Sequence, residues 1–316
     1  MMTKTRKNNE ERSQNLSVSK NFVLIKLFGG LGNQMFQYAT AKVIAEKEKS
    51  QILIDTSFYN DQDANLKKFP RHFTLGIFDN SIRIATEKEI YLFYILTNLE
   101  KLKKKLGFNY PKVFVESTFA FDPQVLKLKA PVYLKGYFQS HNYFSAKEKL
   151  IRNIYKFPLN GLDEKNEKIK RKIVSEYSVS VHIRRGDYVK DKKTKKFHGN
   201  CSMAYYNKAI EFFSSRISDF NLVFFSDDIQ WVQQEFKALP NKKIYVSGNT
   251  DEDSWKDMFL MSLCNHNIIA NSSFSWWGAW LNENSDKKII APKNWFLDVE
   301  QEKNSGDLLP KDWIRI

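Results

Sequence analysis

Phe22-Val-Leu-Ile-Lys-Leu-Phe-Gly-Gly-Leu-Gly-Asn-Gln34 is the stretch that decides the fold. It begins with a short apolar run that is closed by glycines, which is typical of a buried strand. After the glycines, apolar side chains recur at helical spacing up to about Lys47. A second short apolar run at 51–55 predicts another strand. A strand, turn, helix and strand of this size form a βαβ unit, so we expect a parallel sheet.

The rest of the chain is less regular at first and then alternates again. Residues 90–105 show one helical pattern, and a charged segment at 153–172 is typical of a junction between domains. Beyond it, five short segments separated by helical patterns are strand candidates, at 179–183, 222–225, 243–246, 267–270 and 288–291. This alternation predicts a doubly wound α/β fold. We expect two α/β domains that face each other, at 21–155 and 156–316, after a polar, disordered segment at 1–20.

The composition narrows the class of protein. The 316 residues include 50 Lys+Arg and 36 Asp+Glu, a formal net charge of +14, and 42% are hydrophobic. That much apolar material can build packed cores, which excludes a wholly disordered chain. No stretch approaches the roughly 20 apolar residues of a membrane span, and the first twenty residues lack the apolar region of a secretory signal. Cys201 and Cys264 do not resemble a disulfide scaffold, so we expect a cytoplasmic protein. Neither cysteine has a CxxC partner, so we expect no zinc site.

The glycine turn at 29–34 allows an interpretation as a dinucleotide site. Gly30 and Gly32 match the first two glycines of the GxGxxG turn, and Asp55 follows about where an acidic residue binds the ribose. This pattern predicts an NAD-dependent oxidoreductase. Met35 counts against it, because the third glycine of that turn permits close packing of helix and strand.

The same turn has a second interpretation. Asn33 and Gln34 stand at the start of a helix, where amide side chains beside exposed backbone N–H groups can bind hydroxyls as well as phosphate. Tight turns between strand and helix also use glycine for its backbone freedom alone. The glycine turn by itself therefore leaves the function open.

Val181-His-Ile-Arg-Arg-Gly-Asp-Tyr188 is a stronger signal. It places His182, Arg184 and Arg185 at the carboxyl end of a predicted strand, where open α/β sheets bind ligands. A guanidinium group binds phosphate oxygens in a two-pronged fork and stays charged. Adjacent residues of an extended chain point to opposite sides. We therefore expect one arginine to face the ligand and the other to pair with a carboxylate such as Asp187.

Two more motifs follow predicted strands. In 224–228, Asp228 is expected to cap the next helix and Asp227 to accept hydrogen bonds from a purine or a ribose. In 271–280, small hydroxyls and backbone amides at a helix start suit a diphosphate, and the tryptophans are expected to pack. The D-x-D pattern at 251–253 precedes a helix, which favours capping, so we predict no metal site.

These segments together resemble glycosyltransferase family 11, the α-1,2-fucosyltransferases. The matching segments are GGLGNQMFQYA (29–39), VHIRRGDYV (181–189), FSDD (225–228) and NSSFSWWGAWL (271–281), with support from LKGYFQSHNYF (134–144). The resemblance covers about 22–300, and the first twenty residues and the lysine-rich loop 190–196 depart from it. It implies a GT-B architecture, in which two Rossmann-like domains face each other across a cleft. The C-terminal domain would hold the donor, and the N-terminal domain would contribute to the acceptor side.

The resemblance also implies the reaction and its residues. L-Fucose would pass from GDP-β-L-fucose, with inversion and without a metal ion or other cofactor, to the 2-hydroxyl of a terminal galactose. The acceptor would be an oligosaccharide such as lactose, or a glycan of lipopolysaccharide. Arg184 would contact the donor phosphates, and Asn33 would lie close to the transferred sugar. The remaining residues assigned to the donor site are His182, Arg185, Asp227, Asn271, Ser272, Ser273, Phe274, Gly30, Gly32 and Gln34.

The sequence leaves the proton acceptor and the excess of positive charge open. Asp187 and His198 are equal candidates for the general base of the acceptor hydroxyl. The lysines at 101–105 and 190–196 exceed what a diphosphate needs, and we expect them to hold the enzyme at an anionic cytoplasmic membrane surface. Most aromatic residues fall in strand and helix patterns that should be buried, so we predict no nucleic-acid partner.

Overall fold

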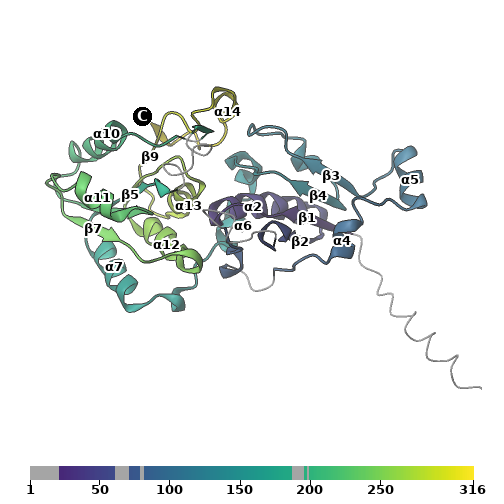
Figure 1. The fold of residues 1–316 in the computed structure, drawn as a ribbon, viewed down its shortest axis with the longest axis horizontal. Helices are drawn as coiled ribbons and strands as arrows, with labels where there is room; N and C mark the ends of the chain where they lie inside the picture. Colours follow the sequence, from purple (N-terminus) through teal and green to yellow (C-terminus); the bar gives the residue numbers. More distant parts are fainter. Residues whose placement is uncertain (1–20, 61–70, 79–81, 187–195, 198) are drawn as a thin grey trace, which may run out of the picture.

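The computed structural model describes residues 21–60, 71–78, 82–186, 196–197 and 199–316. The predictions that fall on residues 1–20, on Asp187, on His198 and on most of the loop 190–196 lie outside these residues. Within them, the chain forms two parallel β-sheets flanked by helices (Figure 1). No helix in this part of the chain is long and apolar enough to cross a bilayer.

The first sheet has four parallel strands in the order β2-β1-β4-β3. They are β1 (Phe22–Lys26), β2 (Gln51–Asp55), β3 (Lys112–Val115) and β4 (Val132–Lys135). Helix α2 (Leu31–Glu48) joins β1 to β2, which confirms the predicted βαβ unit. A strand inside a parallel sheet is covered on both faces, so β1 is a continuous apolar run. Its carboxyl end brings the glycine turn to one edge of the sheet.

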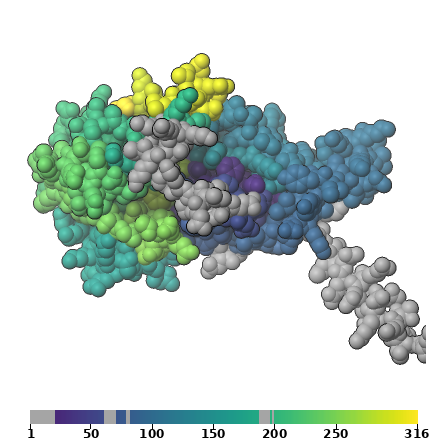
Figure 2. Space-filling model, viewed as in Figure 1, coloured from purple at the N-terminus to yellow at the C-terminus, as the bar shows by residue number. Residues whose placement is uncertain are grey.

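The segment at 87–105, which lies between β2 and β3, differs from the single helix predicted over 90–105. It contains two short helices, α4 (Glu87–Tyr91) and α5 (Asn98–Lys105). Thr97 and Glu100 form a capping box that starts α5: the Thr97 N–H donates to Glu100 Oε2 at 2.8 Å, and the Glu100 N–H donates to Thr97 Oγ1 at 3.3 Å. The apolar spacing that predicted one helix therefore runs across a break. Helix α5 projects at the far end of the molecule (Figure 1), within the blue lobe of Figure 2.

The second sheet has six parallel strands in the order β10-β9-β8-β5-β6-β7. They are β5 (Ser178–Ile183), β6 (Asn221–Ser226), β7 (Lys243–Val246), β8 (His266–Ile268), β9 (Ile289–Ala291) and β10 (Ile314–Arg315). The five strands predicted for this half are all present. Sequence analysis missed β10, because two residues are too few to show a pattern.

Helices complete both halves. The first half also contains α3 (Ser57–Asn60) and α6 (Glu148–Ile154). The second contains α7 (Glu164–Ser175), α10 (Met203–Ser214), α11 (Ile229–Glu235), α12 (Trp255–Leu263), α13 (Ser273–Leu281) and α14 (Val299–Lys303). Short 3-10 turns are η1 (Leu75–Ile77), η2 (Val125–Lys127), η3 (His141–Tyr143), η4 (Ser145–Lys147), η5 (Leu159–Gly161) and η6 (Asp251–Asp253).

The two sheets share an apolar core in which α2 packs against α13 (Figure 1). Phe36 of α2 lies 4.6 Å and 4.9 Å from Trp276 and Trp277 of α13, measured between ring centroids. The Trp277 indole donates a 3.0 Å hydrogen bond to the backbone oxygen of Gly32. A Cβ atom at Gly32 would lie only 2.5 Å from the backbone carbon of Ser273. Glycine at this position thus permits a close approach of the two helices.

The fold class is confirmed as α/β, with two parallel sheets that share an apolar core. The carboxyl ends of the central strands carry the glycine turn of the first sheet and the arginine motif of the second. The boundary predicted between 155 and 156 falls between α6 and α7 and stays a prediction, since the apolar core continues across both halves.

Candidate active site

Arg184 and Asp227 meet at the carboxyl ends of two neighbouring strands. Ile183 and Ser226 are register partners at the ends of β5 and β6, so the residues that follow them leave the sheet side by side. Arg184 Nη1 lies 2.8 Å from Asp227 Oδ2, and each side chain is about a quarter exposed, at 23% and 25%. The fold therefore places a fixed guanidinium group at the edge where parallel sheets bind ligands.

Arg185 has a different environment. Its Nε atom lies 3.1 Å from Asp228 Oδ2, and its guanidinium carbon lies 3.7 Å from the centre of the Trp231 ring. Asp228 also caps α11, as predicted, by accepting a 3.3 Å hydrogen bond from the Trp231 N–H. Both arginines thus pair with a carboxylate, Arg184 with Asp227 and Arg185 with Asp228, whereas the sequence predicted such a pair for only one of them.

Asp227 is held in its charged form. Burial acts to raise the pKa of Asp227, but the Arg184 guanidinium and the N–H groups of Gly186 and Arg185 hold it below its ordinary value. The Arg185 N–H donates to Oδ1 at 2.9 Å. A Cβ atom at Gly186 would lie 2.5 Å from Oδ2, so only glycine lets the backbone come this close. Asp227 in turn orients Arg184.

His182 is buried beside this ion pair. Burial lowers the pKa of His182 to about 3, and Arg184 adds to this effect while Asp227 opposes it. The imidazole is therefore neutral at physiological pH. Its Nδ1 atom is buried and has no hydrogen-bond partner among the described residues. Because buried polar atoms are normally paired, this nitrogen marks a place where a ligand can bind. The Phe274 ring lies 5.9 Å from the imidazole.

Asn33 and the start of α13 connect the two halves. Asn33 Oδ1 accepts hydrogen bonds from Ser273 Oγ at 2.6 Å and from Gln139 Nε2 at 2.7 Å. Ser272 caps α13, because its Oγ accepts a 3.3 Å bond from the Phe274 N–H. Through these contacts the structure brings together six of the predicted site residues, Asn33, His182, Arg184, Asp227, Ser273 and Phe274.

Gln34 and Asn271, also assigned to the donor site, have structural contacts instead. Gln34 is fully buried, and its amide bonds four backbone groups: the oxygens of Gly29 and His72, and the N–H groups of Thr74 and Leu75, at 2.8 to 3.1 Å. Asn271 Nδ2 donates to the backbone oxygens of Gly199 and Trp295, at 3.3 and 3.1 Å. These two amides hold loops beside the site.

Asp55, on which the oxidoreductase interpretation depended, is engaged within the first sheet. It is 2% exposed, it accepts a 2.8 Å hydrogen bond from the Ser57 N–H, and it bonds the Tyr133 hydroxyl. A carboxylate in this environment is not presented to a ribose. Asp55 is therefore not available as the acidic residue that a dinucleotide site of this kind needs.

Glu116 is a half-buried carboxylate that none of the sequence motifs contains. It directly follows β3, and its oxygens accept hydrogen bonds from the N–H groups of Tyr137 at 2.6 Å and Phe138 at 3.0 and 3.1 Å, in the turn after β4. Burial raises the pKa of Glu116 to about 7, against the effect of these N–H groups. A carboxylate immediately after an apolar run, at the same edge as the other motifs, was the signal in the sequence.

An aromatic wall beside Glu116 spans the two halves. We use this name for Phe28, Phe119, Tyr137, Phe197 and Phe296. Tyr137 packs on Phe28 at 4.6 Å and is stacked on Phe119 at 5.7 Å, and Phe119 contacts Phe296 of the second half at 4.8 Å. Except for Phe296, these rings are partly exposed. Partly exposed aromatic faces can bind the apolar face of a sugar ring.

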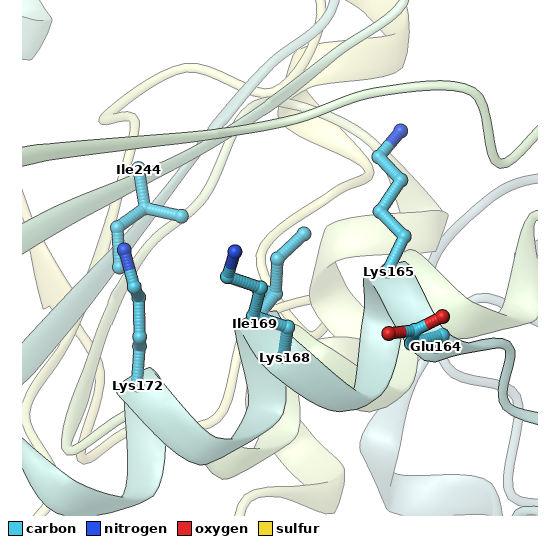
Figure 3. Close-up of a pocket in the computed structure, with 6 residues that line it drawn as sticks. All are labelled: Glu164, Lys165, Lys168, Ile169, Lys172 and Ile244. Carbon is cyan, nitrogen blue, oxygen red and sulfur yellow. The ribbon is translucent and has the colours of Figure 1, made fainter.

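A pocket of about 450 Å³ lies elsewhere, along α7 (Figure 3). Its walls are Glu164, Lys165, Lys168, Ile169, Lys172 and Ile244. Ile244 belongs to β7, the edge strand of the second sheet. None of the predicted site residues lines this pocket, so it is separate from the arginine site.

Comparisons with known proteins agree with the architecture. The family described as Glycosyl transferase family 11 matches residues 89–316. An α-1,2-colitosyltransferase of Escherichia coli is 36% identical over 305 residues, which are 93% of this chain and 98% of that protein. The O-antigen biosynthesis glycosyltransferase WbnK of Escherichia coli is 34% identical over 306 residues, 92% and 99% of the two chains. A galactoside α-(1,2)-fucosyltransferase 1 of Ateles belzebuth is 30% identical over 144 residues, 44% of this chain and 38% of that protein.

The structure has two α/β units that pack against each other, with the arginine motif at the strand ends of the second sheet. The chain belongs to glycosyltransferase family 11. The enzyme is a glycosyltransferase, as the resemblance implied, and the oxidoreductase alternative is wrong for this chain.

Proposed function

We propose that this enzyme transfers L-fucose from GDP-β-L-fucose to the 2-hydroxyl of a terminal galactose and forms an α-1,2 linkage with inversion. The observation that carries the donor half is the cluster of Arg184, Asp227 and the unpaired Nδ1 of His182 at the ends of β5 and β6. The α-1,2 linkage and the galactose acceptor are supported by the names of the relatives. The name of WbnK supports an acceptor among O-antigen glycans.

In this proposal, Arg184 binds the donor diphosphate. Displacement at the anomeric carbon builds negative charge on the departing GDP. The Arg184 guanidinium and the N–H groups at the start of α13 would stabilise that charge in the transition state. Each such contact contributes about 3 kcal/mol, or roughly 10² in rate. The unpaired nitrogen of the neutral His182 would bond the nucleoside part of the donor.

The acceptor hydroxyl loses a proton during transfer, and we assign its removal to Glu116. Its raised pKa of about 7 suits a general base near neutral pH. Glu116 lies beside the aromatic wall, on which the galactose ring would pack. Asp187 and His198, the candidates from the sequence, lie outside the described residues.

Product analysis tests this proposal. Purified enzyme is incubated with GDP-fucose and lactose, released GDP is measured, and the linkage of the product is determined by NMR. We expect an α-1,2-linked fucosyl-lactose. GDP release without a fucosylated galactoside, across a panel of galactose-terminated acceptors, would overturn the acceptor half.

The name of one relative favours GDP-colitose as a second candidate donor. Colitose, the sugar that the 36% identical relative is named for, is L-fucose without its 3-hydroxyl group. A site that hydrogen-bonds this hydroxyl rejects the deoxy sugar strongly, whereas an apolar pocket does not. The ratio of kcat/KM for GDP-fucose and GDP-colitose therefore decides between the two donors. A ratio well above one supports fucose, and a ratio below one supports colitose.

A further inference from the structure

Exposed apolar and basic side chains surround α5, at the end of the molecule away from the second sheet (Figure 1, Figure 2). The apolar side chains are between 51% and 69% exposed. The α4–α5 surface consists of Tyr91, Tyr94, Ile95, Leu99, Leu102, Leu106 and Phe108, together with Lys101, Lys103, Lys104 and Lys105. Single exposed apolar residues are ordinary, but such a group on one projection marks an interaction site.

Helix α5 is amphipathic. Leu99, Leu102 and Leu106 are spaced by three and four residues, which places them on one face. The four lysines stand between and beside them in the sequence. Glu100, the only acidic residue between positions 91 and 108, is 4% exposed, and its carboxylate turns inward to bond Thr97. The charge exposed between positions 91 and 108 is therefore entirely positive; Glu87, the first residue of α4, is an exposed carboxylate outside this range.

The helix is built to remain folded while its apolar face is exposed. The capping box of Thr97 and Glu100 satisfies N-terminal N–H groups, and Lys103, Lys104 and Lys105 lie in the last turn, where cations are favoured by the helix dipole. Glu100 is the buried residue of α5, so burial of leucines does not hold the helix in place. A helix this short is marginal alone, and a surface that covers its leucines would stabilise it further.

We propose that the α4–α5 surface docks this enzyme on an anionic lipid bilayer. The leucines and aromatic side chains would enter the interfacial region of the bilayer, and the lysines would contact the negatively charged headgroups. Aromatic residues such as Tyr91 and Tyr94 suit this region, because one end of their side chain is apolar and the other is polar.

Charge decides in favour of a membrane over a second copy of the chain. A symmetric dimer through this surface would place the lysines of one copy against those of the other. An anionic bilayer instead offers complementary charge to all of them at once. The proposal concerns lipid binding and does not rest on the proposed reaction, so the two can fail separately.

Vesicle co-sedimentation of the full chain tests the proposal without donor or acceptor. The vesicles contain phosphatidylcholine alone or mixed with phosphatidylglycerol. Two variants alter the surface: Leu99→Ser/Leu102→Ser/Leu106→Ser removes its apolar part, and Lys103→Gln/Lys104→Gln/Lys105→Gln removes charge. The matched control is Lys165→Gln/Lys168→Gln/Lys172→Gln, which removes the same charge from α7 (Figure 3).

We expect the wild-type chain and the α7 control to bind the phosphatidylglycerol vesicles and not the phosphatidylcholine vesicles. Each lysine removed from α5 should weaken binding by about fivefold, and the leucine variant should lose binding while its circular dichroism melt stays unchanged. Equal binding to both vesicle types, or an equal loss in the α7 control, would overturn the proposal. A dimer in sedimentation velocity that only the leucine variant dissociates, with vesicle binding intact, would assign the surface to a second copy instead.

Discussion

Asn33 Oδ1 accepts a 2.6 Å hydrogen bond from Ser273 Oγ, although the two residues are 240 positions apart. The same oxygen accepts a bond from Gln139, which follows the turn held by Glu116. These bonds tie the turns after β1 and β4 to the start of α13. The donor and acceptor sides of the proposed site are therefore fixed relative to each other at the residue that we place near the transferred sugar.

Gly32→Ala tests the close approach behind this contact. The new Cβ atom would lie 2.5 Å from the Ser273 backbone, which cannot rotate away, so α2 and α13 would have to separate. We expect the free energy of unfolding to fall by about 1–3 kcal/mol. Gly30→Ala is the matched control, because no atom of the described residues, apart from its two chain neighbours, lies within 4 Å of its added Cβ. Chemical denaturation measures both variants, and equal stabilities would contradict the role of Gly32.

Arg184→Ala should lower kcat/KM by about 10²–10³, because the variant loses a charge that acts on the departing diphosphate. Arg184→Lys should recover only part of the rate, since lysine has no fork. Arg216→Ala is a suitable control: it removes an exposed arginine that bonds the backbone oxygen of Phe212. Initial rates of GDP release measure all three. A near-normal rate in Arg184→Ala, with an unchanged melting temperature, would remove this residue from the donor site.

His182→Phe should weaken GDP binding by tenfold or more, because a hydrogen bond to a buried nitrogen is lost while the ring volume is kept. His182→Asn, which retains a polar group, should lose less. Isothermal titration calorimetry with GDP measures this without turnover. With its pKa lowered to about 3 by burial, His182 stays neutral, so the wild-type affinity should not change through its titration between pH 5 and pH 8. An unchanged affinity in His182→Phe would argue against a ligand at Nδ1.

Glu116 should impose a pH dependence on the rate. Burial raises its pKa to about 7, so it is protonated and cannot accept a proton at lower pH. We expect kcat to rise with pH through about 7, and Glu116→Gln to lose both this rise and about 10²–10⁴ of the rate. The raised pKa also means that ionisation of Glu116 destabilises the fold as the pH rises from its unfolded pKa to about 7. The variant should then lose less stability than the wild type over this interval.

A matched carboxylate separates catalysis from structure at Glu116. Glu89 is 2% exposed, and it caps α4 through hydrogen bonds with Thr86. Glu89→Gln should reduce stability and leave the pH profile of kcat unchanged. If Glu116→Gln keeps the rise of kcat with pH, Glu116 is a positioning residue for the turn at Tyr137 and Phe138, and another group accepts the proton.

Local patterns in the sequence were sufficient for most of the fold. Strands such as β1 and β6 are buried on both faces, so their apolar runs are visible in any short window. The break between α4 and α5 was missed because apolar spacing continues through it, and only the pair of Thr97 and Glu100 marks the new start. The sequence also predicted that Arg184 and Asp227 each follow the end of a strand. It did not predict that they pair, which follows from the adjacency of β5 and β6.

Contacts between segments that are distant in the sequence limit how much of the site could be predicted. The sequence of the glycine turn does not indicate that Asn33 forms a hydrogen bond with Ser273. It also does not indicate that the amide of Gln34 forms hydrogen bonds with four backbone groups. Glu116 stands alone in the sequence, and its raised pKa depends on burial by segments that are far apart along the chain. Such roles depend on tertiary packing, which local residue patterns do not contain.

Removal of divalent metal ions should leave the activity unchanged. Arg184 and the start of α13 supply positive charge where we place the diphosphate, so a metal ion would be redundant. The D-x-D pattern has partners in the protein: Asp253 lies 2.8 Å from Lys256, and Asp251 lies 4.0 Å from His72. Initial rates are measured in EDTA and again after addition of Mn²⁺, with Asp251→Asn/Asp253→Asn as a second comparison that should match the wild type. Activity that disappears in EDTA and returns with Mn²⁺ would show that a metal ion, and not Arg184 with α13 alone, neutralises the departing GDP.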